Sequence, residues 1–260
     1  MILRKEPDGT MIMINQTDHS RLVGQMAAHW GNENFEAVKP FGSIVRAASY
    51  HDYGWLRYET WPAFDDKTGT TPDFRSVPGT PRQLEGYAWV PDWLVNDDPY
   101  ASLIIKMHRT GLWRERYKSI QHPVQSSRTQ GAEIDNFIAK AEAEQERERK
   151  AFDVEELWTN FRLFEVWDLL GLYFCCADPC DDYFEPVPVR YGGDRQEGLR
   201  MTVTAVTPRK VRFDPFPFDK KGLTIQLNYK RLPKQTFADA DEFRAAYFKA
   251  ETEMMNFELV

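Results

Sequence analysis

Apolar residues recur at helical spacing through the first two thirds of the chain. Residues 17–30 place apolar side chains three and four positions apart, after a Thr17 or Asp18 that can cap a helix start, which predicts an amphipathic helix. Similar patterns predict further helices over residues 41–53, 99–117, 131–150 and 153–176. The last of these segments is almost entirely apolar along one side, which favours a long helix in the centre of the core.

The pattern changes after Pro179, where β-forming residues and alternating apolar positions stand between Gly and Pro. The segments that predict strands are "VPVRY", "LRMTVTAV", "KVRFDPFPF" and "LTIQLNYKRL". A final helix is expected near residues 239–252, and the Pro-, Gly-, Thr- and Asp-rich residues 62–92 predict a long loop. We therefore predict a mainly α fold, with a helical core over residues 1–180 and a small β-rich C-terminal part over residues 181–260 packed on it.

Composition narrows the class of protein and its partners. Of 260 residues, 42% are hydrophobic and 14% aromatic, enough for the core of one large domain or of a main domain with a smaller appendage. The formal net charge of −7 disfavours nonspecific binding to nucleic acid or to an anionic membrane surface. No apolar run approaches the roughly 20 residues of a membrane span. The start "MILRKEPDGT" lacks the apolar stretch of a secretory signal, so we expect a cytoplasmic protein with neither nucleic acid nor membrane as partner.

The three cysteines, Cys175, Cys176 and Cys180, all lie in the segment "GLYFCCADPC". Their odd number and close spacing argue against a disulfide framework and favour reduced thiols, as expected in the cytoplasm. The C-x-x-x-C spacing is compatible with a metal site, but no second pair of Cys or His residues stands nearby. Buried structural thiols are the favoured interpretation.

Asp168 is the most informative polar residue, because it stands inside the apolar segment "FRLFEVWDLLGLYF". A buried carboxylate is costly unless it is paired or bound to a metal, so Asp168 requires a partner. The partners available on predicted helices are His19, in a first turn, and the adjacent pair His51 and Asp52, at a helix end. Two imidazoles and two carboxylates form a ligand set that suits Mn, Fe, Co, Ni or Zn better than Mg or Ca. The alternative is a hydrogen-bonded cluster that only holds the helices in register.

The order His19, then His51 with Asp52, then Asp168 resembles the HD-domain superfamily of metal-dependent phosphohydrolases. The segment "AASYHDYG" resembles the helix that carries the HD pair, and "FEVWDLLGLY" resembles the last metal-binding helix of that superfamily. The resemblance implies an HD-like helical core, a divalent metal held by these four residues, and hydrolysis of a small phosphorylated substrate. Trp55 departs from the superfamily, which commonly has a Lys or a similar polar residue shortly after HD-x-G.

A closer resemblance, over most of the chain, is to the family called domain of unknown function 3891. It is carried by "QTDHSRLVGQMAAHWG", "HDYGW", "TGTTPDF" and "DPYASLIIKMHRTGL". This family implies no activity, so a function is implied only by the HD resemblance. Within that interpretation, His108 or the carboxylate of Asp52 relays a proton, and residues 62–92 form a lid or a specificity wall. The side chains expected to contact the substrate are the cations Lys106 and Arg109 and the aromatics Tyr53 and Trp55.

Two other functions remain open at this point. Some HD-like proteins hold a pair of irons and oxidise substrates with dioxygen, in which case His108 would belong to a redox site. The third interpretation is a non-enzymatic binding protein with a vestigial site. The motifs GxxxxGK[ST], GxGxxG and GxSxG do not occur, so nucleotide-binding P-loop, Rossmann and α/β-hydrolase functions lack their working parts. The sequence is compatible with a homo-oligomer.

Overall fold

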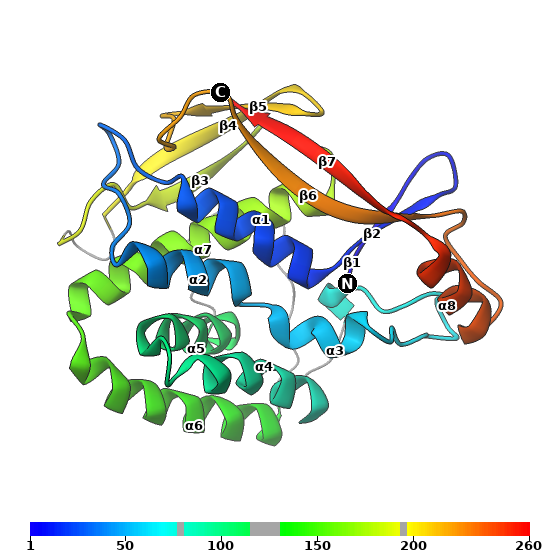
Figure 1. The fold of residues 1–260 in the computed structure, drawn as a ribbon, viewed down its shortest axis with the longest axis horizontal. Coiled ribbons are helices and arrows are strands. Elements are labelled where there is room, and N and C mark those ends of the chain that lie inside the picture. The colour runs from blue at the N-terminus through cyan, green and yellow to red at the C-terminus, as the bar shows by residue number, and fades with distance from the viewer. Residues whose placement is uncertain (77–80, 115–130, 193–196) are drawn as a thin grey trace.

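A computed structural model describes residues 1–76, 81–114, 131–192 and 197–260 of the chain, and its dominant feature is a curled seven-stranded sheet (Figure 1). The strands are β1 (Ile2–Lys5), β2 (Met11–Ile14), β3 (Asp182–Val187), β4 (Leu199–Thr207), β5 (Lys210–Asp214), β6 (Leu223–Leu232) and β7 (Thr252–Leu259). They lie in the order β1-β2-β6-β7-β5-β4-β3. Neighbours pair antiparallel, apart from the short parallel pair of β5 and β7.

The prediction of a mainly α fold is wrong. The chain is 48% helical with 21% of its residues in the sheet, which makes it an α/β fold rather than an all-α core with a small β addition. The sheet also draws on both ends of the chain, because the hairpin of β1 and β2 pairs with β6. A tight turn with Gly9 at φ 85° closes that hairpin. Gly9 ends the sequence Pro7-Asp8-Gly9, which is a recognised turn signal.

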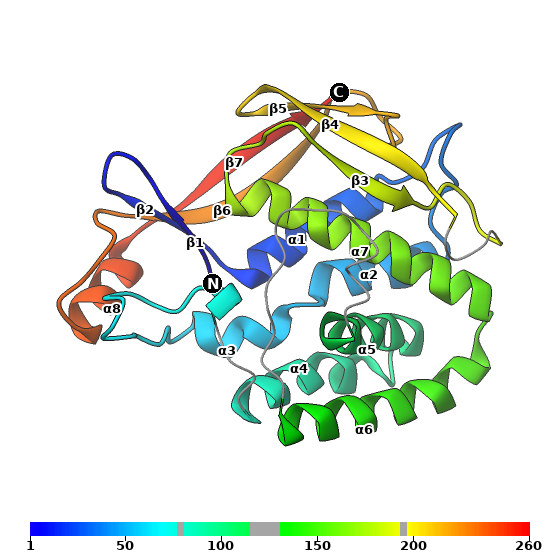
Figure 2. The same cartoon turned by 180° about the vertical axis from the view of Figure 1, so that it is seen from behind.

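The helices are α1 (Gln16–Ala28), α2 (Phe41–Tyr50), α3 (Leu56–Glu59), α4 (Pro81–Leu94), α5 (Pro99–Trp113), α6 (Ala132–Glu148), α7 (Val154–Cys176) and α8 (Ala240–Lys249). Short 3₁₀ turns span Tyr53–Trp55, Phe74–Ser76 and Arg149–Ala151. The curled sheet covers α1 and α7, and α2, α4, α5 and α6 lie beyond this pair of helices (Figures 1 and 2). Within the described ranges, no helix combines the length and the apolarity needed to cross a membrane.

Two local predictions need correction, and a third lies partly outside the described residues. The loop expected over residues 62–92 ends early, because α4 begins at Pro81, and proline is favoured at the first position of a helix. Inside α4, the carbonyl of Pro91 accepts the amide of Val95 at 2.9 Å, so the helical turn continues past this proline. The strand expected at "VPVRY" lies earlier in the chain, in β3, and the predicted extension of the helix at 99–117 beyond residue 114 falls outside the described residues.

Helix α7 is the centre of the core, as its sequence predicted. Its N-terminus is capped by Asp153, whose carboxylate accepts the amide of Glu156 at 2.8 Å. One hydrophobic cluster joins Ile2 of β1, Trp167 of α7 and Phe257 of β7. The helical part and the sheet therefore share a single core.

Candidate metal centre

Helices α1 and α7 approach each other closely at the point where His19 meets Asp168. Gly171 lies one turn after Asp168 in α7, and a Cβ atom there would stand 2.6 Å from Cε1 of His19 and 2.7 Å from Cγ2 of Val23. Only a residue without a side chain fits this contact. The result is a distance of 2.9 Å between Nε2 of His19 and Oδ1 of Asp168, with both side chains buried.

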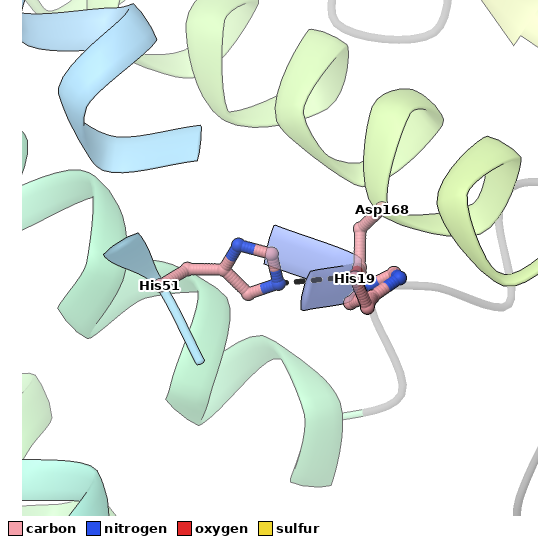
Figure 3. Close-up of side chains that lie close together, drawn as sticks. All are labelled: His19, His51 and Asp168. Atoms are coloured by element: carbon pink, nitrogen blue, oxygen red, sulfur yellow. Dashed lines mark hydrogen bonds and ion pairs between the residues drawn. The ribbon is translucent and has the colours of Figure 1, made fainter. Parts of the chain in front are cut away.

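The second segment reaches the same point from the end of α2. The helix stops at Tyr50, so His51 and Asp52 lie in the turn that follows rather than inside a helix extending to residue 53. Nε2 of His51 lies 3.3 Å from Oδ1 of Asp168 and 3.5 Å from Oδ2 of Asp52. Figure 3 shows the ring of His51 directed toward His19 and Asp168. One ligand atom each from His19, His51 and Asp168 lies within 4.8 Å of the other two.

The backbone fixes the tautomer of His51. Its Nδ1 lies 2.8 Å from the carbonyl oxygen of Ala48, which can only accept, so Nδ1 carries a hydrogen and neutral His51 has its lone pair on Nε2. This Nε2 atom is buried and makes no well-aligned hydrogen bond within the described part of the chain. A buried lone pair facing the carboxylates of Asp52 and Asp168 needs a proton or a cation between them. The donor set therefore fits a divalent metal.

The charges of the cluster are strongly coupled. Burial alone would lower the pKa of His51, but the carboxylates of Asp52 and Asp168 outweigh it and raise that pKa above its usual value. Burial alone would raise the pKa of Asp168, yet the hydrogen bond of His19, the imidazole of His51 at 3.3 Å and the neighbouring His108 hold it well below its usual range. Asp168 therefore stays ionised although it is buried in an apolar helix.

His108 of α5 extends the cluster. A second set of ligand atoms, from His51, Asp52 and His108, also lies within 4.8 Å, and the two sets share His51. The ring centroids of His51 and His108 are 5.0 Å apart, and Phe164 packs against both rings at 5.1 Å. His108 is buried, so it belongs to the same enclosed site as the first set.

The two predicted substrate-binding cations lie beside the cluster and already have protein partners. Nζ of Lys106 forms ion pairs with Glu148 at 2.6 Å and with Glu144 at 3.3 Å, both on α6. Arg109 is buried and donates a hydrogen bond to the backbone carbonyl of His51. In this structure Lys106 fastens α5 to α6, and Arg109 supports the segment that carries His51.

The two aromatic residues expected to contact the substrate, Trp55 and Tyr53, differ in their burial. Trp55 is buried in a separate hydrophobic cluster with Leu84 and Tyr87, so it packs rather than lines an open pocket. Tyr53 is half-buried, and its hydroxyl accepts a hydrogen bond from Nε of Arg21 at 3.0 Å. A contact between these two aromatics and a substrate stays a prediction. His29, at the C-terminal end of α1, lies outside the cluster and is paired with Asp219.

Sequence reasoning missed the residues that support the cluster. Ser20 Oγ accepts the amide of Asp52 at 3.0 Å, and Sγ of Cys175 lies 3.9 Å from Nδ1 of His19. The signal for Gly171 was present, since a glycine one turn after a buried carboxylate in an apolar helix indicates a close contact. The cysteines form no cluster of their own, because Cys175 is buried and Cys180 is exposed.

Comparison with known proteins gives a family. No curated protein and no solved structure matches the chain. A family model with the description "Protein of unknown function (DUF3891)" matches residues 1–234 of the 260, which includes all the helices that carry the cluster. The chain belongs to this family.

Proposed function

We propose that this protein is an HD-like metal-dependent hydrolase that acts on a small phosphorylated substrate. One observation supports this above all: Nε2 of His51 is a buried lone pair without a well-aligned hydrogen bond in the described ranges, and it faces carboxylate oxygens at 3.3 and 3.5 Å. A cation is the ligand that such an arrangement favours. The order of His19, His51 with Asp52, and Asp168 along the chain supports the HD-like interpretation.

The metal would be held by His19, His51, Asp52 and Asp168. Two nitrogen and two oxygen ligands favour Mn, Fe, Co, Ni or Zn. When bound, such a cation polarises a phosphoryl oxygen and lowers the pKa of its water ligand toward neutrality. The protein supplies two carboxylates that balance the charge, and the carbonyl of Ala48 orients the imidazole of His51 from behind.

His108 and Asp52 are the groups that we assign to proton transfer. Both side chains are buried, and both contribute with His51 to the second set of ligand atoms. A buried imidazole can take up or release a proton near neutral pH, which general acid–base catalysis requires. Arg109 would act indirectly, through its hydrogen bond to the carbonyl of His51.

The two overlapping sets also favour a second candidate, an iron-dependent oxygenase. The set of His19, His51 and Asp168 and the set of His51, Asp52 and His108 share His51, whose Nε2 can bind one cation. A second cation would therefore be held by Asp52 and His108. Turnover that requires dioxygen and bound iron would favour this function. Turnover of a phosphate ester without dioxygen, supported by Mn or Zn, would favour the hydrolase.

The test is the metal content of protein purified without a His tag, followed by assays of phosphate esters with Mn, Co or Zn. The parent is expected to hold at least one metal per chain, and His51→Ala and Asp168→Asn are expected to lose nearly all of it. The matched control is His29→Ala, which removes an exposed imidazole that is likewise paired with an aspartate, 3.0 Å away. Equal metal in the parent and in both cluster variants would show that the site is assigned wrongly.

A further inference from the structure

The N-terminus of α1 is capped by a side chain from elsewhere in the fold. Oε1 of Glu59 accepts the amides of Gln16 at 2.5 Å and Thr17 at 3.2 Å, and Oε2 accepts the hydroxyl of Thr17 at 2.6 Å. The residue at the usual capping position, Asn15, makes no side-chain cap within the described residues, although its carbonyl accepts the amide of His19 at 3.0 Å. The first turn of α1, which carries His19, is therefore fixed by Glu59 and Asn15 together.

Glu59 also belongs to the segment that carries the other ligands. It is the last residue of α3, which follows His51 and Asp52 after a single 3₁₀ turn. Its side chain is buried, so the hydrogen bonds to α1 are shielded from water. Glu59 follows Asp52 by seven residues and contacts α1 within one helical turn of His19. One side chain thus links the two segments whose separation decides whether both imidazoles can reach a cation.

A second link comes from the C-terminal helix. The hydroxyl of Tyr247 in α8 lies 3.0 Å from the backbone oxygen of Glu59 and 3.2 Å from Oδ1 of Asn15. Tyr247 is buried, and it lies beyond residue 234, where the match to the family model ends. The C-terminal segment therefore contacts the residues that hold the first turn of α1.

We propose that Glu59 is a positioning residue for the metal centre, and that Tyr247 supports it from α8. Glu59 holds His19 at the distance from His51 at which both imidazoles can share one cation with Asp168. Among the described residues, the hydrogen bonds of these two side chains run to the start of α1, to Asn15 and to the backbone of Glu59 rather than to a ligand atom, so both act through the backbone of α1. This inference rests on the proposed function, because it assigns a role relative to the same metal.

The experiment measures the affinity for Mn²⁺ by calorimetry and the absorption spectrum of the Co²⁺ form. Glu59→Gln is expected to weaken Mn²⁺ binding about tenfold, the lower end of the effect of outer residues that orient metal ligands. Tyr247→Phe removes a single hydroxyl and is expected to weaken binding by a smaller factor in the same direction. Both variants should shift the Co²⁺ absorption bands, which report ligand geometry and which a loss of stability alone would not move.

The matched control is Tyr229→Phe, which also removes one tyrosine hydroxyl, here bonded to Glu253 at 2.6 Å between β6 and β7. It should leave affinity and spectrum unchanged. If Glu59→Gln unfolds, Tyr247→Phe decides the question alone. Parent-like affinity and spectrum in Tyr247→Phe and in folded Glu59→Gln would overturn the positioning role and leave the proposed function intact. A parent that binds neither Mn²⁺ nor Co²⁺ would overturn the proposed function itself, and the positioning role with it.

Discussion

Two buried carboxylates, Glu59 at the N-terminus of α1 and Asp168 in the middle of α7, solve the cost of burial in different ways. The oxygens of Glu59 accept hydrogen bonds from two backbone amides and one hydroxyl, groups that only donate to it. The carboxylate of Asp168 faces the imidazoles of His19 and His51, whose nitrogens can also bind a cation. The hydrogen bonds of the fold satisfy Glu59, whereas the side chains around Asp168 are ones that could also hold a metal ion.

The pKa values of the two carboxylates shift in opposite directions. Burial raises the pKa of Glu59, and the amino group of Met1 and the hydrogen bonds of Glu59 only partly offset that rise. For Asp168 the imidazoles overcome burial and hold the pKa well below its usual value. A carboxylate whose hydrogen bonds are all made by the fold indicates a structural role, whereas an ionised carboxylate among histidines indicates a functional role. The difference teaches that the nature of the partners, rather than burial alone, distinguishes the two roles.

The largest effect expected concerns the stabilisation of the protein by metal. With free Mn²⁺ or Zn²⁺ at about 100 times its dissociation constant, the free energy of unfolding of the parent should rise by about 2.7 kcal/mol. Asp168→Asn should lose nearly all of this gain, because it removes the central ligand. Glu59→Gln should keep about 1.4 kcal/mol of it at the same metal concentration, because its affinity is about tenfold weaker. Urea denaturation with metal and with EDTA measures both; equal gains in the two variants would abolish the distinction between the carboxylates.

A smaller effect is expected from Gly171→Ala, which disturbs the contact between α7 and α1. The new methyl group would collide with His19 and Val23, and overpacking of this kind costs about 1–3 kcal/mol, partly offset by the better helix propensity of alanine. We expect a net loss of about 1 kcal/mol in EDTA, together with much weaker metal binding. The control is Gly42→Ala in α2, where an added Cβ meets nothing within 4 Å. Unchanged metal affinity in Gly171→Ala would show that the close contact does not position His19.

The smallest effect concerns the thiols beside the cluster. Burial raises the pKa of Cys175 well above its usual value and raises the pKa of Cys176 to about 12, whereas Cys180 is exposed. Because the thiolate is the reactive form, iodoacetamide at pH 8 should modify Cys180 first, and modification of Cys176 should increase about tenfold per pH unit up to its pKa. Mass spectrometry of the digested protein gives the order. Early modification of Cys175, near His19, would show that water enters the site from that side.

The convergence of the buried polar side chains could be predicted from the sequence, for a physical reason. A carboxylate in an apolar helix must have a partner, and only a few histidines stood on neighbouring helices, so Asp168 led to His19 and to His51 with Asp52. The directions of Lys106 and Trp55 could not be predicted, because local sequence does not say which neighbour a side chain will meet. Their ion pairs and packing were fixed by α6 and α4.

The fold was harder to predict than the site. The helices α1, α6 and α7 lie close to where their periodicity predicted them, but the fold class was wrong. The strands β1 and β2 are short, and they are stable only because β6, about two hundred residues away in sequence, continues the sheet. The cap from Glu59 was missed for a related reason: it comes from another element, and no spacing rule connects it to α1.

The place of β7 has a consequence for how the protein is made. The last strand of the sequence lies between β6 and β5, with Ile225 opposite Phe257 and Val211 opposite Leu259. Until residues 252–259 leave the ribosome, the strands before them form two separate ribbons, each with an open edge that can pair with another chain. Termination of translation before residue 252 should therefore produce aggregates rather than a smaller folded protein, and chaperones would be needed most until residues 252–259 have been made.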